Sequence, residues 1–502
     1  MGLCKGMSRY DKKGARRKMI DCVSIEQMRR FDKNTIDTKI SSVNLMLKAA
    51  KSVYDEIDKD KKIYIISGSG NNGGDGIALT KLLVDNGYKP SLFLISNKVS
   101  KDSEYFLNQI NNYENIFDIS KCDYKADIIV DCILGTGFHG KVEEPILSVI
   151  KSINKSKAYV VSVDIPSGLN GNNGIDQNSV KADKTIAIQF YKYGHFLNDA
   201  KDFVGELVVK DIGIEKTEKV VKIIEKKDIT FPKRKQNTNK GDYGKAIIIG
   251  GCKDYYGAVK LANMGVASLR SGAGLNVIAV PNSMAPVLGV SIVESSVFPL
   301  KDKDGCILFD KDELDYLIKS ASSFAIGMGM GKSKENKKII EYILENFNGP
   351  VLIDADGLNS LGGDIDVLKK GKNVIITPHP KELSRLINID VSEIINSPVD
   401  IVEKLAKLGN ITVLYKGATT IIANKDDTYF MVDGSACMAK GGEGDTLSGV
   451  ILGLLSQGFS PIVSTYTGAY LCAMAAKRCE KEFSEYGVLA SDVAREIADI
   501  TK

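Results

Sequence analysis

Apolar residues along the first half of the chain fall into blocks that predict alternating helices and strands. They recur at helical spacing over residues 41–54, and the next apolar block, residues 61–66, is short and continuous, as in a buried strand. A glycine-rich segment, residues 67–76, separates this strand from another stretch with helical periodicity. Strand, glycine loop and helix in this order are typical of a dinucleotide-binding fold, and the loop contains one G-x-G-x-x-G match.

The following strand does not fit an ordinary NAD dehydrogenase. Such an enzyme places an Asp or Glu at the end of this strand, where the side chain binds the ribose hydroxyls. Here the strand, residues 91–95, ends in Ser96-Asn97-Lys98. The sequence therefore argues against a simple dehydrogenase.

Two later strands of the first half are followed directly by an aspartate and then by a glycine-containing loop. Residues 126–130 precede Asp131, and residues 158–163 precede Asp164. Because the carboxyl ends of parallel strands share one edge of a sheet, we expect Asn72, Asp131 and Asp164 to converge there. Acids at strand ends can also simply cap a helix or turn, but repeated ends with glycine loops favour a ligand site. Carboxylate and amide oxygens suit a hard cation.

The second half repeats the alternation and predicts another parallel α/β domain. Its short apolar strands, each followed by a polar or glycine-rich loop, are residues 246–249, 324–326, 351–353, 373–376 and 411–415. The lysine-rich segment 215–239 is typical of a linker, so we place the domains at residues 19–224 and 225–502. Residues 1–18 are basic without hydrophobic periodicity, and we expect a disordered extension, with Met19 as an alternative start.

Residues 438–449 carry the strongest chemical signal of the second half. Three glycines precede Asp445, and an apolar helical stretch follows. Unpaired N–H groups at a helix start bind phosphate, and the aspartate suits a general base that takes a proton from a hydroxyl. Taken alone, a glycine-rich turn with Asp445 as helix cap is about as good an interpretation.

Other polar residues of the second half also admit two interpretations. His379 lies between two prolines at a strand end, which favours ligand contact over a purely structural role. Lys416 and Gly417 form either a simple turn or a phosphate contact. Asp354 and Asp356 either cap the next segment or help to hold magnesium through water.

Composition narrows the class of protein. The 502 residues carry a net charge of +4, and no apolar run approaches the length of a membrane span, so we expect neither a nucleic-acid partner nor a membrane. Nine cysteines without a CxxC pair and only three histidines argue against a disulfide framework or a zinc site. We therefore expect a cytoplasmic location.

Three motifs of the first half resemble the epimerase domain of the NAD(P)H-hydrate repair enzymes: residues 70–76, 130–137 and 163–169. The resemblance implies a Rossmann-like three-layer domain that interconverts the R and S forms of hydrated NADH and NADPH, with acid–base help from Asp164 as a catalytic residue. It implies potassium binding by Asn72, Asp131 and Ser167. The residues it implies for binding the hydrate are Asn71, Asn72, Gly73, Gly74, Asp75, Gly135, Thr136, Gly137, Phe138, His139, Gly140, Lys141 and Asp164.

Five motifs of the second half resemble the ribokinase-like dehydratase domain of the same family: residues 354–356, 377–383, 415–418, 441–445 and 488–493. The resemblance implies removal of water from S-NADHX and S-NADPHX with ADP or ATP and Mg²⁺, with Asp445 as the catalytic base, in a homo-oligomer of four or more subunits. The residues it implies for the hydrate are Ala258, Gly329, His379 and Asp445. Those it implies for the nucleotide are Lys416, Gly417, Ala418, Thr419, Thr420 and Gly444.

The chain departs from the family pattern at a few positions. Leu47 and Ala50 stand where the family usually has Glu and Gly, Glu443 replaces a Thr or Ser, and Cys437 replaces a Gly. Two alternatives therefore stay open. The chain could be a ribokinase-like small-molecule kinase with a dinucleotide-sensing accessory domain, or its first half could be a binding module without turnover.

Overall fold

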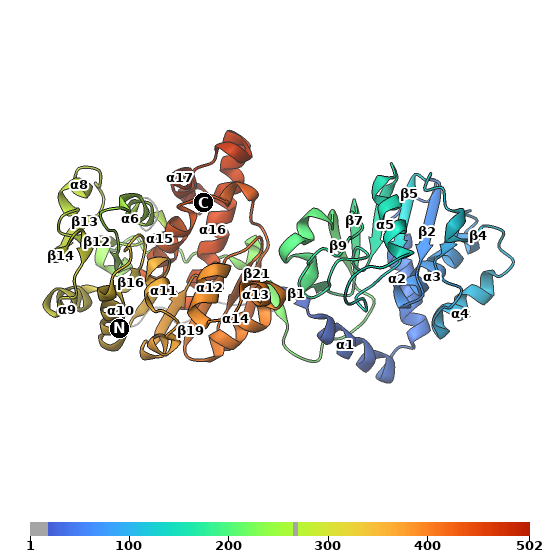
Figure 1. Ribbon diagram of the computed structural model, residues 1–502, viewed down its shortest axis with the longest axis horizontal. Helices are drawn as coiled ribbons and strands as arrows, with labels where there is room; N and C mark the ends of the chain where they lie inside the picture. The colour runs from blue at the N-terminus through green and yellow to red at the C-terminus, as the bar shows by residue number, and fades with distance from the viewer. Residues whose placement is uncertain (1–18, 265–269, 502) are drawn as a thin grey trace. The chain divides into compact units, whose positions relative to one another are not determined.

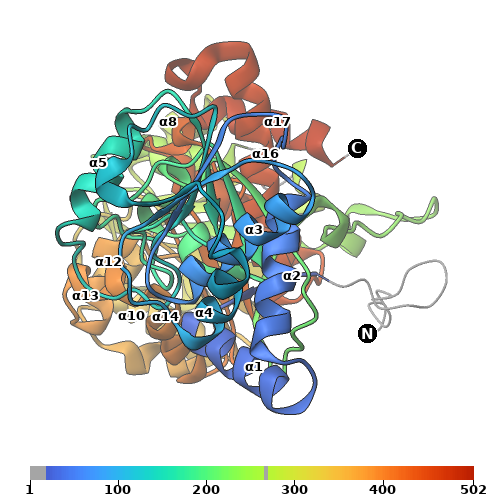
Figure 2. The same ribbon diagram turned by 90° about the vertical axis from the view of Figure 1, so that its right-hand side faces the viewer.

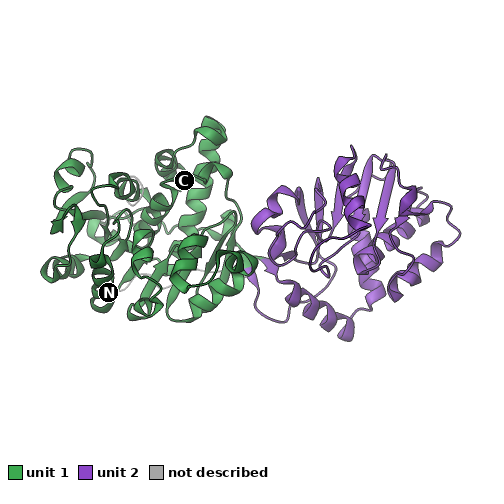
Figure 3. Ribbon diagram, in the orientation of Figure 1, with its two compact units in different colours: residues 1–20, 222–502 green, residues 21–221 purple. Residues whose placement is uncertain are grey.

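The computed structural model describes residues 19–264 and 270–501 and divides into two compact units (Figure 1 and Figure 3). One unit comprises residues 21–221, and the other contains the residues from 222 onward. The expected extension over residues 1–18 lies outside the described residues. The predicted domain boundary between residues 224 and 225 stays a prediction.

The first unit contains a seven-stranded, entirely parallel sheet in the order β4-β3-β2-β5-β6-β7-β9. Its elements are β1 (Ile20–Val23), α1 (Ile25–Thr38), α2 (Ser42–Tyr54), β2 (Ile63–Ser67), α3 (Asn71–Asp85), β3 (Ser91–Leu94), α4 (Lys101–Leu107), β4 (Ile116–Asp118), β5 (Ile128–Cys132), α5 (Ile146–Lys155), β6 (Tyr159–Val163), β7 (Lys184–Ile188), β8 (Tyr191–Lys192) and β9 (Glu206–Lys210). A short parallel pair joins β1 to β8.

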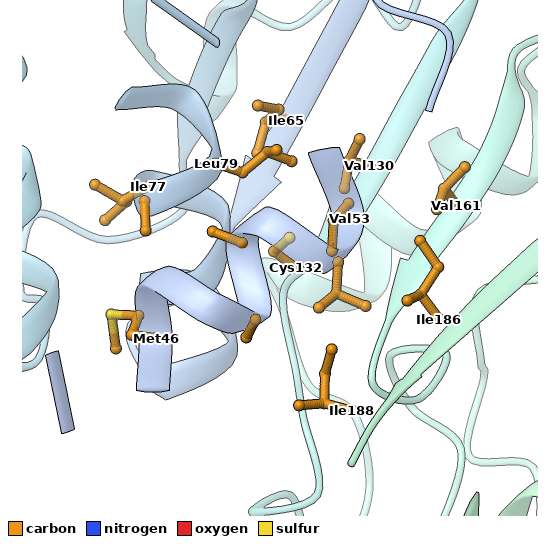
Figure 4. Packing of buried hydrophobic residues seen from close by; sticks show 14 of the residues in the cluster. Met46, Val53, Ile65, Ile77, Leu79, Val130, Cys132, Val161, Ile186 and Ile188 are labelled. Carbon is orange, nitrogen blue, oxygen red and sulfur yellow. The ribbon is translucent and has the colours of Figure 1, made fainter. Parts of the chain in front are cut away.

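Helices cover both faces of this sheet, because apolar side chains of the strands point alternately to one face and to the other. In β2, Ile65 packs in one core with apolar residues of α2 and α3, such as Val53 and Leu79 (Figure 4). Its neighbour Ile66 points to the other face and packs with residues of α5, such as Ile150. Successive side chains of a strand point to opposite faces, so a strand buried on both sides is apolar throughout. Figure 2 shows α5 on one side of the strands and α2 and α3 on the other. The predicted Rossmann-like three-layer architecture is confirmed.

The second unit is built on strands in the order β13-β12-β11-β16-β17-β18-β19-β20-β21-β10. Its elements are β10 (Val221–Ile223), β11 (Lys245–Ile249), α6 (Tyr256–Asn263), β12 (Leu275–Pro281), α8 (Ala285–Gly289), β13 (Ser296–Leu300), β14 (Asp302–Lys303), β15 (Cys306–Ile307), α9 (Lys311–Ser320), β16 (Ser323–Ile326), α10 (Lys334–Asn346), β17 (Pro350–Ile353), α11 (Asp356–Ser360), β18 (Asn373–Ile376), α12 (Pro380–Ile387), α13 (Val391–Asn396), α14 (Pro398–Lys407), β19 (Ile411–Tyr415), β20 (Thr420–Ala423), β21 (Thr428–Met431), α15 (Glu443–Ser456), α16 (Pro461–Gly487) and α17 (Ala490–Ile500). The first seven strands in this order, β13 to β19, run parallel to one another; β11 and β16 to β19 were predicted, whereas β12 and β13 were not. The antiparallel strands β20 and β21 were not predicted.

The second sheet is also covered on both faces. Ala325 of β16 and Leu352 of β17 pack with Ile451 of α15 in one core. Phe324, the neighbour of Ala325, points to the opposite face and meets the ring of Phe347, next to α10, at 4.9 Å between centroids. The predicted α/β class is therefore confirmed for this unit as well. Part of the predicted continuation of α6 toward residue 270 lies outside the described residues.

None of the helices in residues 19–264 and 270–501 has the length and apolar character needed to cross a membrane.

Candidate active sites

A cavity of about 670 Å³ lies at the carboxyl ends of the strands of the first unit. The glycine-rich segment after β2 and the loop after β5 contribute to its lining, and Asp164 does so directly after β6. The predicted residues that line it are Asn71, Asn72, Asp75, Gly135, Thr136, Gly137, Phe138 and Asp164. The structure therefore brings together most of the residues that the epimerase resemblance implied for the hydrate.

Gly73 and Gly74 are not part of the lining of this cavity. They allow close packing of α3 against the elements next to it. A Cβ at Gly73 would lie 1.9 Å from the carbonyl oxygen of Gly68, and one at Gly74 would meet the Met46 side chain. The two glycines thus let the start of α3 pack closely on the loop and on α2. The first N–H groups of α3 lack a capping side chain, because Gly70 stands at the N-cap.

The predicted hydrate-binding residues His139, Gly140 and Lys141 also lie outside the lining of the cavity. The ring of His139 is 2.9 Å from a guanidinium nitrogen of Arg29 in α1, and Arg29 itself lines the cavity. The structure thus links the end of this loop to a helix whose role was not predicted.

Asp164 is the most constrained side chain of the cavity. Its φ of +65° is rare for a residue with a side chain, and the backbone of Ile188 donates to its Oδ1 at 3.1 Å. The fully buried Lys192 forms an ion pair with the same oxygen. The carbonyl of Asp164 lies 2.8 Å from Nε2 of His195.

Hydrogen bonds define the tautomer of His195. Its Nδ1 accepts from the backbone N–H of Lys192 at 3.0 Å, so the proton resides on Nε2 and is donated to Asp164. Burial lowers the pKa of His195 to about 4, and the positive charge of Lys192 acts in the same direction. The imidazole is therefore neutral at physiological pH.

Further carboxyl groups face the same space as Asp164. Asp32 of α1 and Asp75 of α3 both line the cavity. Burial raises the pKa of Asp75 well above its ordinary range, and the charges of Asp164 and Asp32 add to this effect. Burial and the charge of Asp164 also raise the pKa of Asp32. Arg29, Asp32, Lys192 and His195 were missed at the sequence level.

Of the predicted potassium ligands, Asn72 lines the cavity, whereas Asp131 and Ser167 lie outside its lining. Asp131 is within β5 and fully buried, and its carboxylate accepts four hydrogen bonds: from Ile133 N at 3.2 Å, Ser162 Oγ at 2.8 Å, Ser167 N at 2.9 Å and Ser167 Oγ at 2.5 Å. Asn72 and Asp164 thus line the cavity, whereas Asp131 is part of the strand and connects to the loop after β5 through Ser167, whose hydroxyl also reaches Leu134 O. Burial raises the pKa of Asp131, although these hydrogen bonds oppose it.

Asn72 gives the test of whether a cation fits here. Its Nδ2 donates to Leu134 O at 3.1 Å, whereas its buried Oδ1 has no hydrogen-bond partner. A buried polar atom without a partner is costly, and an amide oxygen is a suitable ligand for a hard cation. The unpartnered Oδ1 of Asn72 therefore fits a potassium ion, whereas the oxygens of Asp131 and Ser167 are already hydrogen-bonded.

The two departures in α2 do not add or remove a polar group at the cavity. Leu47 lies outside the lining and is 38% exposed, whereas Ala50 is fully buried in the core. The neighbours that do line the cavity are Leu45, Met46 and Ala49. The absence of a glutamate at position 47 therefore leaves the carboxylates of the cavity in place.

In the second unit, a buried carboxylate connects the ends of the strands to α15. Asp354, directly after β17, accepts from Lys416 Nζ at 2.9 Å and from Ser448 Oγ of α15 at 2.8 Å. Lys416 also lies 3.7 Å from Glu382. Burial alone would lower the pKa of Lys416, but the charges of Asp354 and Glu382 outweigh it, so that the pKa is raised. The predicted phosphate-binding lysine is thus charged and paired with carboxylates.

Asp445 lies in the first turn of α15 beside this network. Burial raises its pKa to about 7, with a further contribution from the charge of Asp354 that Lys416 opposes. A Cβ at the neighbouring Gly444 would lie 3.4 Å from Lys416 Nζ and 3.6 Å from Asp354, so the glycine gives the backbone close access to both. Gly442 precedes the helix with a φ of +96°, where a side chain would also collide with Leu261. A carboxyl group with a pKa near 7 at a glycine-rich helix start is suited to general base catalysis.

His379 caps α12 next to the same network. Its Nδ1 accepts from the backbone N–H groups of Lys381 at 3.1 Å and Glu382 at 3.3 Å. Burial lowers the pKa of His379, although the Glu382 carboxylate opposes this shift. The remaining ring nitrogen, 3.4 Å from Glu382, therefore carries the proton of a neutral imidazole.

The remaining predicted residues of this unit lie in three places. Ala258 of α6 is next to Gly329, since a Cβ at Gly329 would lie 2.9 Å from that of Ala258. Gly417, Ala418 and Thr419 connect β19 to β20, where Thr420 is the first residue. Asp356 begins α11 and accepts from Gly331 N at 2.8 Å.

Glu443, the departure next to the glycines, is buried in the protein. Neither carboxylate oxygen has a hydrogen-bond partner, and burial raises the pKa of Glu443 to about 7, a shift that Lys440 opposes. Cys437 is also buried, and its thiol lies 3.9 Å from Ala476 O. The side chain of Glu443 is therefore withdrawn from solvent at the helix start.

Both units belong to the class of α/β proteins that bind small ligands at the carboxyl ends of their strands. A family model described as NAD(P)H-hydrate dehydratase matches residues 246–499, and one described as YjeF-related protein N-terminus matches residues 42–194. The chain is 30% identical to the bifunctional NAD(P)H-hydrate repair enzyme Nnr of Coxiella burnetii, over 93% of this chain and 96% of that one. It is 31% identical to the enzyme of the same name from Escherichia coli, over 93% and 91%.

The chain therefore belongs to the family of bifunctional NAD(P)H-hydrate repair enzymes. Among solved structures, the ADP/ATP-dependent NAD(P)H-hydrate dehydratase from Bacillus subtilis, co-crystallised with ATP and Mg²⁺, is 27% identical with a TM-score of 0.45, over 54% of this chain and 93% of that one.

Proposed function

We propose that this chain repairs hydrated nicotinamide coenzymes. Its first unit interconverts R- and S-NAD(P)HX, and its second unit dehydrates the S form to NAD(P)H at the expense of ADP or ATP. Membership of the repair family supports both activities. The single observation that carries the reaction is the buried Asp445, with a pKa of about 7, beside Gly444 and Lys416.

In the proposed dehydration, Asp445 takes the proton of the substrate hydroxyl. The terminal phosphoryl group of the nucleotide is transferred to the oxygen of that hydroxyl. Hydroxide is a poor leaving group, whereas the phosphate formed in this way leaves with the electron pair of the C–O bond. Loss of a proton from the adjacent ring carbon then restores the double bond of NAD(P)H. The N–H groups from Gly441 to Gly444 stabilise the charge of the transferred group, as backbone donors do in an oxyanion hole.

The other binding residues of this unit are assigned by the same reasoning. Lys416 exchanges its carboxylate partners for nucleotide phosphate, the segment 417–420 contacts the nucleotide, and Ala258, Gly329 and His379 contact the hydrate. Asp354 and Asp356 would hold Mg²⁺ through water, since magnesium usually takes only one or two protein carboxylates beside phosphate oxygens. When bound, Mg²⁺ would supply positive charge to these phosphates.

In the proposed epimerisation, the cavity of the first unit promotes exchange of the hydroxyl between the two faces of the ring. Hydration of the enamine places the hydroxyl on the carbon bonded to the ring nitrogen. The nitrogen lone pair can expel this hydroxyl as water once a carboxyl group has protonated it, which leaves a cationic ring. Water then adds to the other face and returns a proton to a carboxylate. Asp164 lies against this ring, with Asp75 and the segments 71–74 and 135–141 around the coenzyme.

A potassium ion held by Asn72, Asp131 and Ser167 would order the loop after β5 and add positive charge next to the coenzyme phosphates. The unpartnered Oδ1 of Asn72 supports this assignment. We also propose a homo-oligomer of four or more subunits in the cytoplasm. The described cysteines are all free, which supports a reducing compartment.

The experiment that tests the function supplies the purified chain with NADHX and with each nucleotide in turn. We expect the absorbance of NADH to return with ADP or ATP, and pure R hydrate to be consumed faster than it epimerises spontaneously. Failure of NADH to return, with phosphorylation of a vitamin-precursor alcohol instead, would identify a small-molecule kinase. R hydrate that persists at the spontaneous rate would make the first unit a binding module.

A further inference from the structure

Lys192 is a charged residue with no exposure to solvent, beneath the cavity of the first unit. Its ammonium group forms an ion pair with Asp164 Oδ1 and donates to Ile188 O at 2.7 Å. Burying an ammonium group is unfavourable unless a close counter-charge and further hydrogen bonds offset the loss of hydration. A buried ammonium group is therefore expected where its charge is needed. Among the described residues, the only charged group to which Lys192 bonds is Asp164, which lines the cavity.

Residues of the segment 188–195 contact both the side chain and the backbone of Asp164. Ile188 N and Lys192 Nζ hold its carboxylate, and His195 Nε2 holds its backbone carbonyl. Asp164 has a φ of +65°, a strained conformation for a residue with a side chain that persists only where its surroundings hold it. Three contacts from one short segment thus fix both the backbone and the side chain of the residue that faces the reacting ring.

The charges around Asp164 show what Lys192 contributes beyond packing. Asp32 from α1 and Asp75 from α3 bring further carboxyl groups to the cavity, and His195 is neutral. Among the described residues, Lys192 is the cation that forms an ion pair with Asp164; Arg29 of α1 also lines the cavity but hydrogen-bonds to His139. Lys192 therefore fixes the position of the Asp164 carboxylate among these groups.

We infer that Lys192 is a positioning residue for epimerisation: it holds Asp164 as a fixed anion against the ring carbon that becomes cationic when the hydroxyl leaves. The inference rests on the epimerase function proposed for this cavity. Lys192 does not line the cavity, so it acts on the substrate only through Asp164.

The test compares Lys192→Met, Lys192→Arg, Asp164→Asn and the double variant K192M/D164N in the full-length chain. The matched control is Lys184→Met, which removes a lysine of β7 that pairs with Glu56 outside the cavity lining. We expect K192M to lower kcat for R-to-S conversion roughly 100-fold, the range of acid–base contributions, with little change in KM. K192R retains the charge and should recover most of this loss, and K184M should stay within about threefold of the wild type.

The double variant separates a positioning role from a general effect on the fold. If Lys192 acts through Asp164, K192M/D164N should be no more than about threefold slower than D164N alone. Full additivity of the two losses, or a wild-type rate for K192M, overturns the inference. If hydrogen exchange shows that K192M unfolds the first unit, Lys192→Gln replaces it, and the same two outcomes decide. A wild-type chain without epimerase activity would instead overturn the proposed function, while return of NADH from the S hydrate shows that the protein is intact.

Discussion

Glu443 allows a quantitative prediction about stability. Its carboxylate is buried at the start of α15, and neither oxygen has a hydrogen-bond partner. Burial raises its pKa from the ordinary 4.5 to about 7. The change Glu443→Gln keeps the shape of the side chain and removes the charge.

The magnitude follows from the difference between the folded and unfolded pKa. Because the folded state binds the proton more tightly, the stabilising contribution of protonated Glu443 is fully present below pH 4.5 and is lost as the pH rises through about 7. At pH 8 the charged side chain therefore costs about 3 kcal/mol, whereas at pH 5 it costs about 1 kcal/mol or less. The cost of an unpartnered Gln does not depend on pH, so the stability difference between E443Q and the wild type should shift by about 2 kcal/mol in favour of the variant from pH 5 to pH 8.

Urea titrations at both pH values measure this difference. Pulse proteolysis, followed on peptides from residues 222–501, reports the fraction of the second unit that is unfolded at each urea concentration. The control is Glu485→Gln, an exposed glutamate of α16, which should show no such dependence on pH. If the difference between E443Q and the wild type is the same at pH 5 and pH 8, Glu443 is not a buried charge and our account of it is wrong.

Four further predictions concern the two units. Asp445→Asn should abolish dehydration while nucleotide still binds, as judged by calorimetry, and a near-normal turnover would contradict the assignment of the base. Since Asp445 must be ionised to accept a proton and its pKa is about 7, wild-type kcat for dehydration should rise with pH through this value, and a flat profile would exclude it as the base. Asp164→Asn should slow only the repair of R hydrate, by roughly 100-fold, and should leave conversion of pure S hydrate unchanged. Gly73→Ala should destabilise the first unit by several kcal/mol, measured by urea unfolding, because its Cβ would lie 1.9 Å from Gly68 O, and wild-type stability would contradict the packing described here.

The main features of the fold were predictable because they depend on short stretches of sequence with a recognisable apolar and polar pattern. Each parallel strand that was predicted is a short apolar run before a glycine or polar loop, as in residues 61–66 and 351–353, whereas β9, Glu206–Lys210, carries charged residues and was not predicted. A strand that helices cover on both faces is recognised from such a continuous apolar run alone. The strands β20 and β21 were missed because residues 416–420 were interpreted as a turn or a nucleotide contact, and the alternation of the residues after them was not considered.

The candidate sites were predictable only in part. Asp164 and Asp445 follow recognisable motifs, so their positions could be inferred from the chain. Lys192 and Asp32 could not, because they come from β8 and α1 and meet Asp164 only through the tertiary fold. Asp131 shows the converse limit, since a position next to a glycine loop did not reveal that its carboxylate is buried in the strand and already hydrogen-bonded.

The backbone at position 164 also restricts which amino acids can replace the aspartate. Asn and Gly tolerate a φ of +65° most readily, whereas branched residues are strongly disfavoured. The substitutions that this site accepts without unfolding are thus the ones that delete its negative charge. Chance variation at this single position would most readily produce a well-folded chain that has lost one of its two reactions and kept the other.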